Sequence, residues 1–251
     1  MASASSIRQP YADLGDATEE LVTITASNRT TTSHHCVKRK LLCETSRWFR
    51  DALKDEAVSH VQIPKHLDCH ECIKHYIHWL NTGKLATMDP PASVCPSLAS
   101  DKEYTLLGGL WYFGDDYGIP GLQDAAISAV LAKMESSKAA SGLDLPGGTC
   151  INFVYHPSAD LSNPRTPFNK LQETLVEMYA TQDSVRQLEQ MNGKVSAYFL
   201  ADLCKRQNAL LRAPRPDRKR LAEDNACAFH QHGTQELCGA GGPAAKKQRR
   251  K

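Results

Sequence analysis

Four residues between positions 66 and 75 carry the side chains that zinc prefers. His66, Cys69, Cys72 and His75 recur at three-residue steps, and thiolate and imidazole are the usual zinc ligands. On a helix, however, this stretch spans about 14 Å, whereas zinc–ligand bonds are only about 2.0–2.3 Å long. One ion cannot collect all four side chains, so we expect no metal here and predict that Cys72 is a buried core residue.

Histidines and cysteines gather again near the C-terminus, at Cys227, His230, His232 and Cys238. Their spacing matches no common zinc finger. We therefore predict neither a metal nor another cofactor. A zinc- or thiol-dependent enzyme or sensor stays as an alternative function, and it rests on these two clusters.

Nucleophilic catalysis requires a base beside an activated serine or cysteine. His34 and Cys36 are two residues apart on a predicted strand, so the alternation of a strand places them on one face. The chain lacks the glycine-rich and serine-centred motifs of nucleotide-binding proteins and hydrolases. We expect no catalytic residues and predict that the protein is not an enzyme.

The strands that would position these side chains lie almost wholly in the first 65 residues. The stretches 21–25, 30–37 and 58–63 are short and rich in β-branched residues or alternate in polarity. We predict a hairpin followed by a third strand. Apolar residues at three- and four-residue spacing predict helix over 38–54, and Ser46 divides this helix by capping its second half.

Helix signals dominate the rest of the chain. The predicted helices cover 69–81, 101–118, 120–134, 168–180 and 195–211. We expect Asp68 to cap the first helix and Gly83 to end it, and Pro120 to occupy a first helical turn. The proline-rich stretches 85–100 and 156–167 and the Gly/Ser-rich stretch 136–149 are predicted connections.

Strands followed by helices predict an α+β fold, in which helices cap a small N-terminal β-sheet. We divide the chain into a disordered N-terminus (1–18), a sheet-and-helix domain (19–136), a C-terminal helical extension (150–212) and a disordered basic tail (213–251). The core of the 101–118 helix is predicted to contain Tyr104, Leu107, Leu110 and Trp111. The core of the next helix is predicted to contain Leu122, Ala125, Ala126, Ala129 and Val130.

Several blocks of this sequence resemble the BTB/POZ domain, of the type common in fungal proteins. The run V-K-R-K-L-L-C-E-T-S-R-W-F at 37–49, the strand ending at Pro64, W-L-N-T-G at 79–83 and G-D-D-Y-G-I-P-G-L-Q-D-A at 114–125 occur in the family's order. Downstream segments resemble the C-terminal helical extension of the fungal members. Lys38 stands where the family usually has histidine. The resemblance implies an assembly module that in many members homodimerises and in some recruits a cullin-type ubiquitin ligase.

The same resemblance places a docking face on the segment 58–64 and the helices of 101–119. We single out Val58, Val61, Tyr104 and Tyr112 as candidate interaction residues. Tyr112 lies between two other aromatic residues on a helix, where each step turns about 100°, so all three cannot face one core. A second packing contact, against the 168–211 helices, is the favoured role for Tyr112.

Charge is divided unevenly along the chain, although the net charge is only +2. Residues 205–251 contain 12 Lys/Arg and 4 Asp/Glu. Such a basic appendage on an acidic body is typical of targeting segments, and we predict recognition by an importin-type receptor and a nuclear location, with the cytoplasm as the alternative. The predicted targeting residues are Arg218, Lys219, Arg220, Lys246, Lys247, Arg249, Arg250 and Lys251. Any nucleic-acid binding by this tail would be non-specific and salt-sensitive.

Composition narrows the class of protein further. No apolar run reaches the length of about 20 residues that crosses a bilayer, so we expect no membrane partner. Nine cysteines without an export signal predict reduced thiols. We therefore predict a non-catalytic protein–protein interaction module that binds itself or another protein. The alternative within the same fold is a substrate adaptor that binds a cullin.

Overall fold

The computed structural model describes residues 20–27, 32–63, 70–88, 96–140, 144–155, 169–182, 188–189, 191 and 194–212. The predicted N-terminal segment 1–18, the cap Asp68, the connection 156–167 and the tail 213–251 lie outside these residues. Two compact units make up the chain, residues 1–68 and residues 69–251. This division falls well before position 136, where we placed the end of the first domain.

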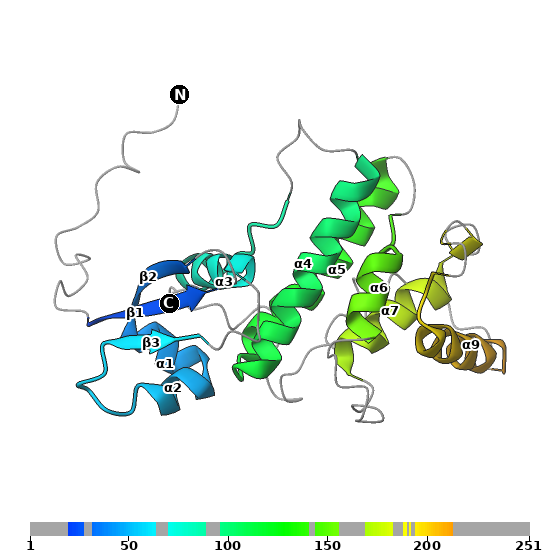
Figure 1. Cartoon of the computed structure of the whole chain (residues 1–251). Coiled ribbons are helices and arrows are strands. Elements are labelled where there is room, and N and C mark those ends of the chain that lie inside the picture. Colours follow the sequence, from blue (N-terminus) through cyan, green and yellow to red (C-terminus); the bar gives the residue numbers. More distant parts are fainter. Residues whose placement is uncertain are drawn as a thin grey trace, which may run out of the picture. The chain divides into compact units, whose positions relative to one another are not determined.

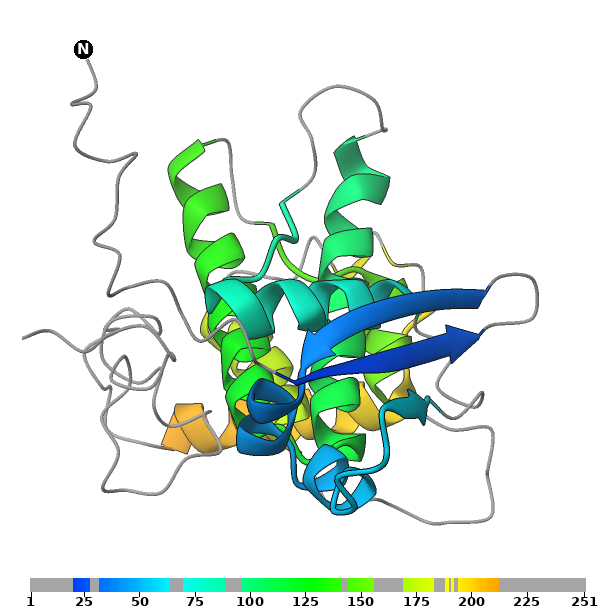
Figure 2. The same cartoon turned by 90° about the vertical axis from the view of Figure 1, so that its left-hand side faces the viewer.

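The first unit contains a three-stranded sheet of order β2-β1-β3 (Figure 1). β1 (Leu21–Ser27) pairs antiparallel with β2 (Thr32–Lys38) and parallel with β3 (His60–Gln62). The hairpin is drawn in blue in Figure 2. Val22 and Ile24 point to one face and are completely buried, because alternate side chains of a strand share a face. The predicted hairpin and third strand are confirmed, and the third strand is shorter than predicted.

Two short helices connect β2 to β3, as predicted. α1 (Arg39–Thr45) ends at Ser46, which then caps α2 (Arg47–Ala52). The Ser46 hydroxyl accepts a hydrogen bond from the Phe49 backbone N–H at 3.1 Å, which satisfies one of the donors that a helix leaves open at its N-terminus. The sheet together with this helix pair and the helices of the second unit makes the fold α+β.

The second unit is helical. Its long elements are α3 (His70–Thr82), α4 (Pro96–Asp116), α5 (Pro120–Ala140), α6 (Gly148–Tyr155), α7 (Lys170–Thr181) and α9 (Ala197–Arg212). Gly83 follows α3 with a positive φ of 69° and its N–H donates to the Trp79 carbonyl, so it ends the helix as predicted. Pro120 begins α5, also as predicted.

Two predicted connections are partly helical, and these predictions were wrong. α4 begins at Pro96, inside the predicted loop 85–100, and α5 continues to Ala140, inside the predicted linker 136–149. Proline at the first helical position breaks nothing, because the N–H that it lacks has no helical partner there. The helix α6 (Gly148–Tyr155) is not among the predicted helix ranges.

The core of the second unit lies between α4, α5, α6 and α7 (Figure 1). All four residues predicted for the α4 core are buried. In α5, Leu122, Ala126 and Val130 are buried as predicted, whereas Ala125 and Ala129 are half-buried. Ile127 is completely buried and was not predicted, which shifts the buried face of α5 slightly around the helix.

Among the described helices, none combines the length and the apolar character that crossing a membrane requires. Cys72 is completely buried, as predicted, but it takes part in a disulfide bond. The expectation of reduced thiols throughout is therefore wrong at this position, while Cys36, Cys43, Cys150 and Cys204 are free thiols.

Candidate functional site

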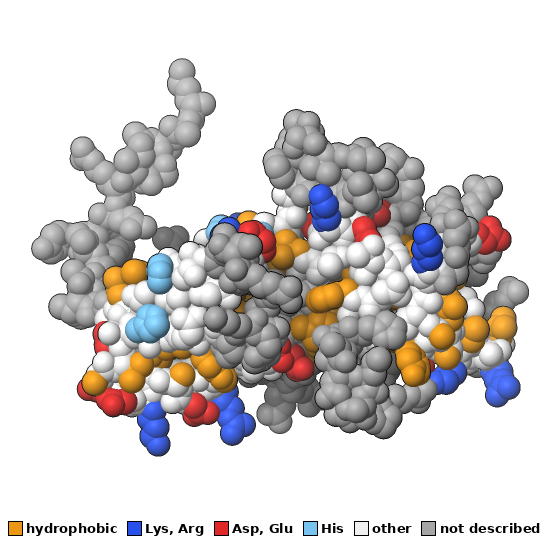
Figure 3. Space-filling model, in the orientation of Figure 1, with side chains coloured by type: hydrophobic (Ala, Val, Ile, Leu, Met, Phe, Trp, Pro, Cys, Tyr) orange, Lys and Arg blue, Asp and Glu red, His pale blue; other side chains and the backbone are white. Residues whose placement is uncertain are grey.

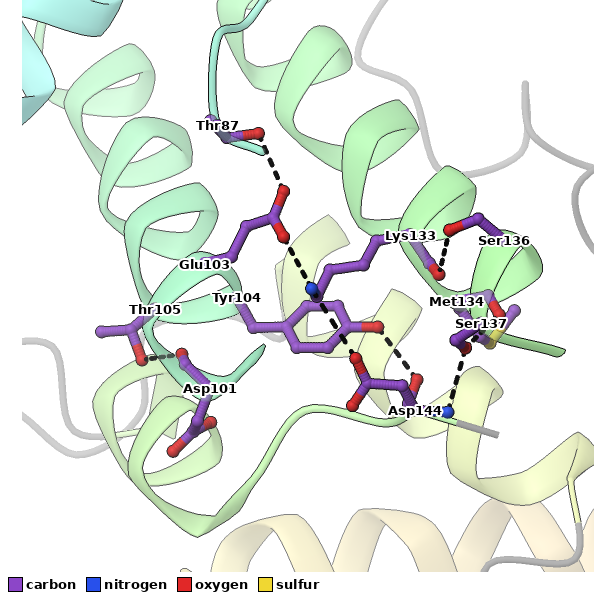
Figure 4. Close-up of polar contacts among 10 residues, drawn as sticks. All are labelled: Thr87, Asp101, Glu103, Tyr104, Thr105, Lys133, Met134, Ser136, Ser137 and Asp144. Atoms are coloured by element: carbon purple, nitrogen blue, oxygen red, sulfur yellow. Dashed lines mark hydrogen bonds and ion pairs between the residues drawn. The ribbon is translucent and has the colours of Figure 1, made fainter. Parts of the chain in front are cut away.

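A connected polar cluster of the second unit surrounds Lys133 (Figure 4). The Lys133 ammonium group lies 2.6 Å from Glu103 Oε2 and 3.6 Å from Asp144 Oδ2. It also lies 5.1 Å from the centre of the Tyr104 ring, within the range of a cation–π interaction. The other Glu103 oxygen accepts a hydrogen bond from the Thr87 hydroxyl at 3.1 Å. The charges of this cluster are thus largely paired within the molecule.

This cluster fixes the connection between α5 and α6 against α4. The Tyr104 hydroxyl donates to the Asp144 carbonyl at 3.0 Å, and the Gly147 N–H donates to the Asp101 carboxylate at 2.9 Å. Burial raises the pKa of Tyr104, and the nearby carboxylates of Asp144 and Glu103 raise it further. The phenol therefore stays a donor, and the arrangement stabilises the connection between α5 and α6.

Tyr112 makes a second packing contact, as favoured, but its ring packs on α6 and not on the 168–211 helices, of which only Asn169 reaches its hydroxyl. Its ring packs edge-on against Phe153 of α6, with ring centroids 5.8 Å apart. Its hydroxyl donates to the Val154 carbonyl at 2.7 Å and lies 3.5 Å from Asn169 Nδ2, at the start of α7. Burial raises the pKa of Tyr112 to about 12, although the Asn169 hydrogen bond lowers it. α4 is thereby attached to α6 and to the start of α7.

The other candidate interaction residues are mostly interior. Val61 is 6% exposed and pairs with Ile24 in the sheet, and Tyr104 is 1% exposed. Val58 is half-buried. The structure therefore removes Val61 and Tyr104 from an exposed docking face, because apolar periodicity on its own does not distinguish a docking patch from a core.

Large exposed apolar side chains instead gather on α9, together with Phe153 of the neighbouring α6. Tyr198 is 56% exposed, Leu200 38% and Leu211 84%. Hydrophobic side chains cover this region of the second unit in Figure 3. Helical spacing places Leu200, Cys204 and Leu211 on one stripe, which we call the α9 stripe. The sequence does not reveal this stripe, because apolar spacing on its own does not show which apolar face of a helix is buried.

A neighbouring face of α9 is anchored to the unit. Phe199 is completely buried, and its ring centroid lies 5.5 Å from that of Tyr155 and 5.2 Å from that of Tyr179. The Arg206 guanidinium forms two contacts with the carboxylate of Glu177 on α7, and its pKa is raised chiefly by this hydrogen bond. α9 therefore presents the α9 stripe from a fixed position.

The histidines and cysteines considered as metal ligands, for which no metal was predicted, and the predicted targeting residues are only partly described. His66, Cys69, the cysteines and histidines of 227–238 and all eight basic targeting residues lie outside the described residues. His75 is half-buried, and burial lowers its pKa. In the part of the chain that the structure describes, no group of three or more His, Cys, Asp or Glu residues is arranged to hold a metal ion.

The predicted pair of His34 and Cys36 does share one face of the sheet, and Cys36 is exposed. The His34 Nδ1 atom, however, is hydrogen-bonded to the hydroxyl of Thr25 at 2.8 Å. A second imidazole, that of His60 on β3, bonds to the same hydroxyl. Neither Thr25 nor His60 was singled out from the sequence.

Comparison with known proteins adds no relative. No family model, no curated protein and no solved structure matches this chain.

Proposed function

We propose that this chain is a non-catalytic protein–protein interaction module with the organisation of a BTB/POZ domain and a helical extension. The order of its elements supports the proposal: a hairpin, a pair of short helices, a third strand and then a series of helices. The blocks that resemble the family fall on these elements in the same order. The contacts of Tyr112 also connect α4 to α6 and to the start of α7, within the predicted extension.

The observation that carries the proposal is the two-sided character of α9. One side is held by Phe199 and Leu203, which are 0% and 3% exposed, while Leu200 and Leu211 remain exposed on the adjacent stripe. A helix that is fixed on a folded body and keeps large apolar side chains in water is typical of docking surfaces. Protein partners, including a second copy of this chain, are the class that such a surface binds.

The test replaces two residues of the α9 stripe in the full chain, with Leu200→Glu and Leu211→Glu combined. The matched control is Ala209→Glu, which adds a carboxylate to an exposed position on another face of the same helix. Light scattering after size exclusion measures self-association, and affinity purification from cells identifies other partners, with a cullin among the possible results. We expect the double variant to lose the association and the control to keep it.

The wild-type protein could prove strictly monomeric and bind the same partners as the double variant. That result would contradict a docking role for α9. Far-UV circular dichroism of each variant establishes that the helices are intact. Identical spectra then attribute any lost association to the surface and not to unfolding.

The basic residues of the C-terminal segment support a nuclear location as a second part of the proposal. Five of the last six residues are Lys or Arg, and such runs bind the acidic grooves of import receptors through charge. Replacing the cations of 246–251 by alanine, separately from those of 218–220, tests each run. Fluorescence microscopy of tagged protein is the measurement, and unchanged nuclear accumulation in both variants would contradict this part.

A further inference from the structure

One face of α9 (Figure 1) is exposed along the whole helix and carries no charge. Helical geometry places seven residues within about 120° of one another on this face, and every one of them is exposed. We call this set the uncharged α9 face, and it consists of Ala197, Leu200, Ala201, Cys204, Gln207, Asn208 and Leu211. The exposed side of a surface helix ordinarily carries charged residues, so this face differs from one that only meets water.

The charged residues near this face are paired within the chain. Arg206 contacts the carboxylate of Glu177 on α7, and the Lys205 ammonium group lies 2.9 Å from Asp202 Oδ1. A second helix that covers the uncharged α9 face therefore removes no charge from water, which would cost free energy. Charge complementarity favours a partner whose contact surface is uncharged as well.

We propose that this partner is a second copy of the chain, and that two α9 helices pack antiparallel about a two-fold axis, an inference that rests on the docking role proposed for α9. In a two-fold interface the same surface lies on both sides of the contact. The uncharged α9 face fits this condition, because it brings no like charges together at its centre. Antiparallel packing also places the positive end of each helix dipole beside the negative end of the other.

The spacing of the two leucines of the α9 stripe fits the same arrangement. When the two-fold axis passes between positions 205 and 206, Leu200 of one copy lies level with Leu211 of the other, and symmetry repeats this contact. Leu200 is 38% and Leu211 84% exposed in the single chain, so both contacts cover apolar surface that otherwise meets water. Ala197 and Ala201 on the same face are small, and small side chains let two helices approach closely.

Cys204 lies near the axis of this pair. Its position is about one and a half residues from the midpoint, so the two Cys204 α-carbons are displaced by about 4.5 Å along the helices. With helix axes about 8–10 Å apart and α-carbons about 2.3 Å from each axis, the two α-carbons are about 6–7 Å apart. A disulfide spans about 4.4–6.8 Å between α-carbons. Because Cys204 is an exposed free thiol, an oxidant can trap the pair at this residue.

The pair should be weak because the contact is small. α9 has 16 residues and is therefore about 24 Å long. One helix face of this length covers less than the roughly 800 Å² per partner of a standard interface. We expect the dimer to form at high protein concentration and to require trapping for its detection.

The experiment treats the full chain with diamide, an azo oxidant. Two thiols give up two electrons and two protons, an S–S bond forms, and diamide is reduced to the hydrazine. Non-reducing electrophoresis measures the rate, and mass spectrometry identifies the linked peptides. We expect the wild type to form a dimer linked through Cys204. Cys36→Ser, which removes another exposed thiol, should keep this dimer, and Cys204→Ser should lose it.

The matched control combines Cys204→Ser with Ala209→Cys, which moves the thiol to an exposed position on another face of α9. This control should cross-link at least about 10-fold more slowly than the wild type, because thiols held together in one complex react at a high effective concentration. Equal rates in the two proteins would overturn the pairing.

Two variants built on Cys204→Ser test the direction of the helices. A mixture of Leu200→Cys and Leu211→Cys chains should form a disulfide between positions 200 and 211. Leu200→Cys on its own should not, because antiparallel packing separates the two 200 positions by about 16 Å. A disulfide between the two 200 positions would show parallel packing and contradict the proposal.

The outcomes separate this proposal from the docking role of α9. Cross-linking at Cys204 could prove no faster than in the control while Leu200→Glu combined with Leu211→Glu still loses another bound protein. In that case α9 binds a different partner, and only the pairing of two copies is wrong. If the combined glutamate variant also keeps every partner, both proposals are wrong. Circular dichroism of each variant establishes that the helices are intact.

Discussion

Arg39, the first residue of α1, holds the segment that leads from α2 into β3. Its Nη1 atom donates to the Leu53 carbonyl at 2.8 Å, and its Nη2 atom donates to the Glu56 carbonyl at 3.0 Å and to the Val58 carbonyl. Its Nε atom forms an ion pair with Glu20 at 2.7 Å. Only 12% of the Arg39 side chain is exposed. We therefore predict that Arg39→Ala loosens residues 53–58 and destabilises the first unit.

The expected loss of stability can be worked out from these contacts. Two of the bonds, to Leu53 and Val58, are partly buried, and a hydrogen bond to a charged group contributes about 1.5–3 kcal/mol. The Glu20 carboxylate is 51% exposed, so its ion pair adds at most about 1 kcal/mol. Arg39→Ala should therefore cost about 3–6 kcal/mol. Arg39→Lys should cost about half as much, because an ammonium group keeps the charge but not the planar fork.

Urea unfolding combined with hydrogen exchange measured by mass spectrometry tests this prediction. Exchange should rise in peptides that cover 47–63 and stay unchanged in α5, which belongs to the other unit. Arg50→Ala is the matched control, since Arg50 makes a single exposed bond from its Nε atom to the Cys43 carbonyl and should cost under about 1 kcal/mol. If Arg39→Ala changes the stability by less than about 0.5 kcal/mol, as at an ordinary surface position, the reasoning is refuted.

Three further predictions follow from other contacts. Lys133→Met should lower the free energy of unfolding by about 2–3 kcal/mol in a urea titration. This value is below the range for a fully buried ion pair, because the Lys133 side chain is 18% exposed. The control is Lys102→Met at an exposed position, which should change the free energy of unfolding little. Ser46→Ala should cost about 1 kcal/mol through the lost cap, measured by thermal unfolding; an unchanged Tm would contradict this. Burial raises the pKa of Tyr112 above its unfolded value, from 10.0 to about 12, so the stabilisation linked to its protonation is complete below pH 10 and lost as pH rises through 12. In Tyr112→Phe the free energy of unfolding should fall less steeply between pH 9 and 12 than in the wild type. If the two proteins show the same dependence on pH, another group is responsible for the loss.

The local features of the fold were predictable because their causes are local. Ser46 caps α2 through a bond to a backbone N–H three residues away, and Gly83 ends α3 by taking a positive φ. Alternating or helical apolar spacing located the hairpin and the buried face of α4. Each of these signals operates within a few residues, so it can be read from a short stretch of sequence.

The ends of α4 and α5 were mispredicted for a related reason. Proline and serine between 85 and 100, and serine and glycine between 136 and 149, are statistical signals for loops. Neither stretch contains a residue that forbids helix at the positions where the helices extend. Packing between two long neighbouring helices adds stability that intrinsic propensity does not include, and the helices continue into these stretches.

The candidate sites were less predictable than the fold. Val61 and Tyr104 are apolar residues at suitable positions, and their sequence does not tell a docking surface from a core; burial in the folded unit does. The α9 stripe could be identified only from the structure, in which Phe199 on a neighbouring face of that helix is buried. His60 is separated from Thr25 by 35 residues, so no local pattern connects them.

The sequence by itself determined the α+β class, the order of strands and helices, the cap at Ser46 and the uneven distribution of charge, because these depend on residue type and short-range spacing. The tertiary structure decided which side chains meet. Pairing of β1 with both β2 and β3 brought His34 and His60 to one hydroxyl, and packing of α4 beside α5 brought Glu103 to Lys133. The Thr25–His60 and Glu103–Lys133 contacts join residues that are 35 and 30 positions apart, a separation over which only the folded backbone sets the distance.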